Sequence, residues 1–166
     1  MDMDIPNNCY SLCDCTCGNY SQDFDIIREE ETLFKETLTD LCHSNIGFYS
    51  DRSFGDQHFL TGWREKDSIS VYILWHKDDY CPKHDLFHMK SLYVGKGFIQ
   101  KRLVDHWKSK DFSEEMIVYF SYLSMENRQA KYYEQLLLDL YSFPHNNSEN
   151  SGKGLLCAHF TQFEVD

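Results

Sequence analysis

The stretch from Ile69 to Trp75, ISVYILW, decides the fold of this chain. Large apolar side chains stand at positions 69, 71, 73 and 75, and the alternate positions hold serine, tyrosine and leucine. Because successive side chains of a β-strand point to opposite faces of the sheet, this alternation predicts a strand with one buried face. Tyr72 lies on the other face, so its hydroxyl has a purpose other than core packing.

The chain after Trp75 continues as an alternation of strand-like and helix-like segments. A polar connection precedes a short strand, and two glycines end that strand and begin a helix. An apolar run, a second helix and a loop rich in Ser, Asn and Gly follow. In chain order these segments are 77–90, 91–94, 95–110, 116–123, 125–141 and 142–154, with a last short element from Gly154. This order predicts an α+β fold, a small three-stranded antiparallel sheet flanked by helices.

The first 68 residues differ in character from the rest. Residues 1–22 are polar and lack apolar periodicity, whereas apolar residues from Phe24 to Leu41 recur at helical spacing. We therefore expect two parts: an acidic, cysteine-containing extension over residues 1–68 with one helix at about 24–44, and a folded unit over residues 69–166. Residues 45–68 carry no pattern that assigns an element.

Charge is distributed unevenly along the chain. The formal net charge is −11, of which residues 1–69 carry −9 and residues 70–166 carry −2. An acidic total argues against a nucleic-acid partner, because phosphate binding normally uses Lys and Arg. The segment 96–110 nevertheless carries five basic residues and one acidic residue. This basic strip is either a solvated helix face or a phosphate-binding surface.

Composition bears on the class of protein and on its compartment. Hydrophobic residues make up 42% of the chain and aromatic residues 16%, which suffices for a packed core. No apolar run approaches the roughly 20 residues of a membrane span, and the acidic N-terminus lacks a signal-peptide pattern. We therefore expect an intracellular protein of the cytoplasm or nucleus, without a membrane partner.

The seven cysteines form no standard metal-binding pattern. Four of them stand close together near the N-terminus, at Cys9, Cys13, Cys15 and Cys17. Clustered thiols in an intracellular protein favour metal over disulfide, but this spacing is not that of a zinc ribbon. We expect a tail with incidental thiols, with structural Zn²⁺ as the alternative. Cys81, His84 and His88 form a second possible ligand group, with a mobile hairpin as the alternative interpretation.

Several polar residues follow the second expected strand at informative positions. Gly95 and Gly97 bracket Lys96 where a helix is expected to begin, and unpaired N–H groups beside glycine favour phosphate binding there. On that helix Arg102 and His106 are four positions apart and share a face. On the later helix a carboxylate, Glu134, lies beside an apolar stripe, where it is costly unless it is paired or binds a metal.

The order of these residues resembles that of the GIY-YIG nucleases. Ser70-Val71-Tyr72 stands where that family has its first motif, and Tyr93-Val94-Gly95 stands where it has its second. The form LYVGKG, with twenty residues between the two tyrosines, is most similar to the branch of ankyrin-repeat and LEM-domain endonucleases. The resemblance covers residues 69–156, the catalytic module alone, and identifies residues 69–166 as a GIY-YIG-like domain.

This resemblance implies a metal-dependent endonuclease that hydrolyses DNA phosphodiester bonds, in duplex or branched DNA, and acts in repair or restriction. The implied catalytic residues are Tyr72, Tyr93, Arg102, His106 and Glu134. The implied phosphate- or DNA-binding residues are Gly95, Lys96, Gly97, Lys101, Asn146 and Asn147, the two asparagines being alternatives for one late position of the family.

The implied mechanism uses one divalent ion. Glu134 would be the only protein ligand of Mg²⁺ or Mn²⁺, a hard cation that keeps most of its waters. Tyr72 would take a proton from the attacking water, its pKa lowered by Lys96 and the metal. Arg102 and Lys96 would hold the phosphate and Tyr93 would hydrogen-bond it. His106 would be an alternative base or would orient Tyr72.

Two other classes of function remain open from the sequence. The chain would be a nucleic-acid-binding module without catalysis if the fold is kept and the activity lost. It would be a regulatory interaction protein if the acidic extension is its working part. The sequence leaves the choice between monomer and homodimer open.

Overall fold

The computed structural model describes residues 36, 38–54, 60, 62–81, 85–146, 152 and 155–165. Its centre is a five-stranded antiparallel sheet in the order β1-β4-β2-β3-β5. The strands are β1 (Gly47–Tyr49), β2 (Ile69–Cys81), β3 (Leu86–Phe98), β4 (Val118–Ser124) and β5 (Cys157–Thr161). The helices are α3 (Leu38–His43), the 3₁₀ turn η2 (Asp51–Ser53), α4 (Ile99–Lys108), α5 (Asn127–Leu140) and α6 (Gln162–Val165).

The expected three-stranded sheet is wrong in its number of strands, although the mixed α and β content agrees. The two additional strands lie at the edges of the sheet: β1 pairs with β4, and β5 pairs with β3. Strand β1 has only three residues and lies in a segment without apolar alternation. Its position follows from hydrogen bonds to β4, which a periodicity argument does not detect.

The segment expected as a polar connection, 77–90, is the far half of a long hairpin. Strands β2 and β3 each have 13 residues and remain paired from Ile69 opposite Phe98 to Cys81 opposite Leu86. Two register irregularities, between Leu74 and Trp75 and between Lys77 and Asp79, interrupt the alternation. Polar residues also occupy exposed positions there, which made this half of the hairpin resemble a loop.

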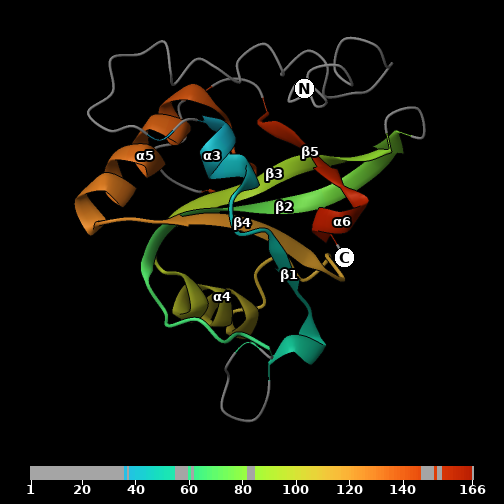
Figure 1. The fold of residues 1–166 in the computed structure, drawn as a ribbon, viewed down its shortest axis with the longest axis horizontal. Coiled ribbons are helices and arrows are strands. Elements are labelled where there is room, and N and C mark those ends of the chain that lie inside the picture. The colour runs from blue at the N-terminus through green and yellow to red at the C-terminus, as the bar shows by residue number, and fades with distance from the viewer. Residues whose placement is uncertain are drawn as a thin grey trace.

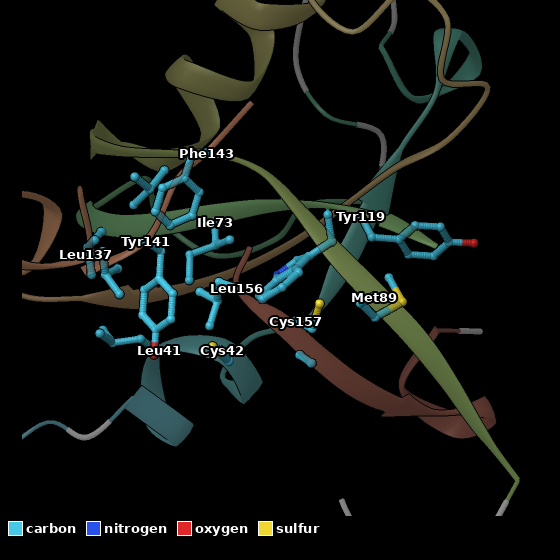
Figure 2. Close-up of a cluster of buried hydrophobic side chains, with 14 of the residues drawn as sticks. Leu41, Cys42, Ile73, Met89, Tyr119, Leu137, Tyr141, Phe143, Leu156 and Cys157 are labelled. Atoms are coloured by element: carbon cyan, nitrogen blue, oxygen red, sulfur yellow. The ribbon is translucent and has the colours of Figure 1, made fainter. Parts of the chain in front are cut away.

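Helices cover both faces of the sheet (Figure 1), so the prediction that β2 buries one face is wrong. On one face, Val71, Ile73 and Trp75 pack with α3 and α5, and Figure 2 shows part of this cluster. On the other face, Tyr72 and Leu74 pack with α4 and β1. The central position of β2 in the sheet explains why its residues 70–75 are all buried.

The part of the chain before residue 69 contributes to this same sheet and core. Within the helix expected at about 24–44, α3 occupies Leu38–His43, and the positions before Glu36 lie outside the described residues. Leu41 and Cys42 are 2% and 0% exposed, which places them fully inside the core. Among the described residues no helix combines the length and apolar character needed to cross a bilayer.

Candidate functional site

The first candidate side chain, Tyr72, crosses the sheet surface over a glycine. In the β2–β3 hairpin Tyr72 lies directly opposite Gly95. A Cβ atom at Gly95 would lie 2.6 Å from the Tyr72 hydroxyl oxygen and 2.8 Å from the Tyr93 ring. The second motif therefore needs glycine at this position because two tyrosine rings converge on it. The centroids of these two rings are 6.0 Å apart.

Helix α4 brings a histidine to the Tyr72 hydroxyl. The Tyr72 oxygen and His106 Nε2 are 2.8 Å apart, although 34 residues separate them in the sequence. Both residues are buried, with exposed fractions of 0% and 6%. The helix supplies this contact because it returns directly from the end of β3 and packs Ile99, Leu103 and Val104 against the Tyr72 face of the sheet.

Arg102, one helical turn before His106, joins the same cluster. Its guanidinium lies near Tyr72 and Tyr93 and interacts electrostatically with both. A Cβ atom at Gly97 would lie 3.1 Å from Arg102 Cγ, and Gly97 has a φ of +134°, which favours glycine. Gly97 thus lets the Arg102 stem pass close to β3. Arg102 Nε is buried without a hydrogen-bond partner.

The expected phosphate cradle at the start of this helix is absent from the described geometry. Gly95, Lys96 and Gly97 belong to β3, and α4 begins only at Ile99. The carboxylate of Asp67 accepts hydrogen bonds from the backbone N–H groups of Gln100 (2.8 Å) and Lys101 (3.1 Å). A carboxylate of this chain therefore occupies the anion-binding end of the helix.

The turn after α4 carries Asp111, a residue that the sequence analysis did not identify. The chain turns back after the helix, with the N–H of Lys110 bonded to the Trp107 carbonyl and the N–H of Asp111 bonded to the His106 carbonyl. Lys110 has a φ of +57°, so the turn is a Schellman cap. It places a carboxylate oxygen of Asp111 2.9 Å from His106 Nδ1.

Burial sets the protonation of the tyrosine and the histidine. Burial raises the pKa of Tyr72 far above its usual value, Tyr93 adds to this effect, and the nearby Arg102 opposes it. The expectation of a lowered Tyr72 pKa is therefore wrong for the protein alone, because desolvation of the phenolate outweighs one cation. Burial also lowers the pKa of His106 below 6.5, although Asp111 opposes this shift.

A cavity of about 410 Å³ opens beside this cluster. Among the expected site residues, Tyr93, Arg102 and His106 line it. The other lining residues are Asp105, Ser109, Asp111, Phe112 and His145. Tyr72 does not line the cavity, and its hydroxyl contacts His106, which does.

The two lysines expected to bind phosphate lie elsewhere. Lys96 is directly opposite Val71 and therefore lies on the α5 face of the sheet, where its Nζ donates to Asn127 Oδ1 at 2.9 Å. Lys101 is largely exposed on α4 and forms an ion pair with Asp105 at 3.2 Å. Neither lines the cavity beside Arg102.

The remaining expected site residues follow β4. Glu134 is half-buried on α5, the helix that packs on the sheet face opposite Tyr72, and it does not line the cavity. The Asn146 side chain accepts from the Val94 N–H at 3.0 Å and donates to the Val94 carbonyl at 2.9 Å. Asn146 thus completes the hydrogen bonding of β3 where β5 does not reach. Asn147 lies outside the described residues.

The second cysteine–histidine group is only partly described. Cys81 and His88 are buried in the β2–β3 hairpin, and His88 packs edge-on against His159 of β5 with ring centroids 4.6 Å apart. His84 and the N-terminal cysteines lie outside the described residues. Within the described ranges, no three His, Cys, Asp or Glu side chains are arranged to hold a metal ion.

Sequence reasoning missed two carboxylates and one aromatic residue at this site. Asp67 caps α4, Asp111 contacts His106, and the ring of Phe112 packs against His106 with centroids 5.4 Å apart. Asp111 could have been found from its place five residues after His106, just past the end of a helix.

No family model, curated protein or solved structure matches the chain.

Proposed function

We propose that this protein cleaves phosphodiester bonds of DNA, as a nuclease of the GIY-YIG type. The observation that carries the proposal is the 2.8 Å contact between the Tyr72 hydroxyl and His106 Nε2, with Arg102 and Tyr93 beside it at the cavity. Four residues implied independently by the order of the motifs converge there from β2, β3 and α4. A substrate of this kind places the proposed site of action inside the cell.

Arg102 is the proposed phosphate contact. Its guanidinium is always charged and presents donors in a planar fork that matches phosphate oxygens. In the free protein, Nε is buried without a partner, which is costly for a charged donor. A phosphate entering the cavity would satisfy that donor. It would also draw the guanidinium away from Tyr72 and open the hydroxyl to a water molecule.

Tyr72 and His106 form the proposed proton path. As the water oxygen bonds to phosphorus, its proton moves to the Tyr72 oxygen and the Tyr72 proton moves to His106 Nε2. The bond from phosphorus to the 3′ oxygen breaks, and that oxygen takes a proton from solvent. His106 returns its proton to solvent afterwards. This route avoids a free phenolate, which burial disfavours at Tyr72.

The proposed cofactor is Mg²⁺ or Mn²⁺, with Glu134 as the ligand that the resemblance implies. In the described part of the structure, the proposed metal ligand Glu134 and the proposed phosphate contact Arg102 do not share a cavity. Glu134 lies on α5, which packs on the sheet face opposite Tyr72, and it is not among the residues that line the cavity beside Arg102.

The experiment is cleavage of supercoiled plasmid by the purified chain, with Mg²⁺ and with EDTA. Tyr72→Phe tests the proposed proton path, and Tyr119→Phe is its matched control, a tyrosine of similar burial in the other core cluster. We expect the control to nick plasmid as the parent does and Tyr72→Phe to be strongly impaired. Equal nicking by both variants would refute the site. Glu134→Ala tests the metal ligand separately.

A second candidate is a DNA-binding module without hydrolysis. The absence of Glu134 from the lining of the cavity favours it, because binding to Arg102 needs no metal ligand. The two functions differ in one measurement, plasmid binding and plasmid nicking by the same protein sample over a Mg²⁺ titration. Binding without nicking at every Mg²⁺ concentration would establish the second candidate.

A further inference from the structure

We infer that Asp111 is a positioning residue, which holds His106 in the one neutral tautomer that can accept the Tyr72 proton. The inference rests on the proposed function for its catalytic meaning, but the tautomer itself is a property of the free protein. The contacts that carry it are Asp111 Oδ2 to His106 Nδ1 at 2.9 Å and His106 Nε2 to the Tyr72 oxygen at 2.8 Å.

The tautomer follows from the donors and acceptors in this chain of three residues. An aspartate at neutral pH carries only acceptor oxygens, so the ring nitrogen that faces it must carry the proton. Neutral imidazole has one N–H, and burial keeps His106 in the neutral form. Nε2 is then the acceptor, and the Tyr72 hydroxyl donates to it. Without Asp111 the proton could reside on Nε2, where it would face the Tyr72 oxygen and block transfer.

The backbone around Asp111 is shaped for this contact. Asp111 stands between two non-glycine residues in the left-handed region, Lys110 with φ +57° and Phe112 with φ +60°. A left-handed backbone at a non-glycine residue is conformationally strained, and it persists only where surrounding contacts stabilise it. The Schellman cap holds Lys110, and the buried ring of Phe112 packs against His106 and Tyr93. Both contacts turn Asp111 back toward His106.

Asp111 also acts when His106 becomes charged. As Nε2 takes the Tyr72 proton, the imidazolium that forms is buried between Arg102 and the carboxylate. Arg102 lowers the pKa of His106, whereas Asp111 raises it by hydrogen bonding and by charge, and Asp105 raises it by charge alone. The groups that contact the ring from outside α4, besides Asp111, are the Tyr72 hydroxyl and the rings of Tyr93 and Phe112. Asp111 is the acid in direct contact with the ring.

The direct test is nitrogen-15 NMR of the His106 ring in the full chain without substrate. We expect Nδ1 to carry the proton in the parent. In Asp111→Asn we expect a shift of population toward Nε2–H, because an amide can donate to Nδ1 as well as accept from it. The matched control is Asp105→Asn, which removes a nearby charge on the same helix without touching the ring, and it should keep Nδ1–H. Protonated Nε2 in the parent, or one unchanged tautomer in all three proteins, would overturn the inference.

Kinetics provide the second readout in any preparation that cleaves DNA. Asp111→Asn should lower kcat by roughly 10²- to 10⁴-fold with KM little changed, the range that covers a general acid–base group and the loss of a tautomer-fixing carboxylate. The acid limb of the pH profile should move to lower pH, because the His106 pKa loses its carboxylate. Unchanged kcat and an unmoved acid limb would overturn the catalytic role. If the parent cleaves nothing, the proposed function fails, whereas the NMR result still decides the tautomer.

Discussion

The hydroxyl oxygen of Tyr72 lies 2.8 Å from His106 Nε2, which joins the first motif of the sequence to the last turn of helix α4. Three features of the fold surround this contact. Gly95 leaves room for the phenol to cross β3, and the Asp67 carboxylate caps the N-terminus of α4. The stem of Arg102 packs over Gly97. The site is thus a consequence of the turn from β3 into α4, and changes in that turn should alter activity.

Substitution of Gly95 by alanine should disrupt the site directly. The new Cβ would lie 2.6 Å from the Tyr72 hydroxyl oxygen and 2.7 Å from the ring carbon that bears it. Because the phenol is fully buried, it cannot move aside without displacing its neighbours. We expect a loss of about 1–3 kcal/mol in the free energy of unfolding, as for other overpacked sites. Urea denaturation measures it, and a variant as stable as the parent would contradict the close approach.

Replacement of Arg102 by alanine should weaken cleavage by about 3 kcal/mol in transition-state stabilisation, the usual effect of losing one charged donor. The loss should appear in kcat/KM measured on a short labelled duplex. Arg128→Ala on α5 is the matched control, since Arg128 is exposed and does not line the cavity. Equal kcat/KM values for the two variants would mean that general charge, and not position, governs the effect.

The turn after α4 offers a test of the cap. Lys110 has a φ of +57° at the position where Schellman caps favour glycine. Lys110→Gly should therefore raise the free energy of unfolding by about 1 kcal/mol. Lys108→Gly, two residues earlier at the last position of the helix, should lower it by up to about 1 kcal/mol. Two changes of the same sign in urea denaturation would contradict this assignment of the helix end.

Stability should fall as the pH is lowered below neutrality. Burial lowers the pKa values of His106 and His88 below 6.5, so the unfolded chain binds protons more readily than the folded protein. The stability that the neutral rings contribute is fully present above pH 6.5 and is lost as the pH falls toward their folded pKa values. Urea midpoints at pH 7.5 and 5.5 measure this loss.

The contribution of one ring can be separated in the same experiment. His106→Gln should show a smaller loss between the two pH values than the parent, whereas His145→Gln, a partly exposed histidine, should keep the full loss. A parent protein that is more stable at pH 5.5 than at pH 7.5 would contradict the buried, neutral state of these histidines.

The sequence predicted the juxtaposition of four side chains near the hairpin better than the sheet around them. The resemblance to the motif order of the GIY-YIG nucleases grouped Tyr72, Tyr93, Arg102 and His106, and these side chains lie close together in the structure. Strand β1 could not be predicted, since three residues carry no alternation and their pairing with β4 joins positions about 70 residues apart. Asp111 was missed because its role depends on the left-handed backbone at Lys110, where helix caps usually have glycine.

Glu134 shows where motif order is insufficient. Its position beside an apolar stripe of α5 is as expected, but the face of the sheet that α5 covers is decided by packing of Ala130, Tyr133 and Leu137 with Val71 and Ile73. Alternation places Tyr72 on the other face. Periodicity within a helix therefore gives the side that is buried, and does not give the distance from that side to a cavity across the sheet.

The central claim is that Tyr72 and His106 act together on a phosphodiester. Single-turnover cleavage of an end-labelled duplex with Mg²⁺ tests it most directly, using the parent, Tyr72→Phe, His106→Gln and the double variant. Residues that share one proton path lose about as much singly as together, so we predict similar losses of 10²-fold or more in all three variants. Full cleavage by Tyr72→Phe, or losses that multiply in the double variant, would contradict the account.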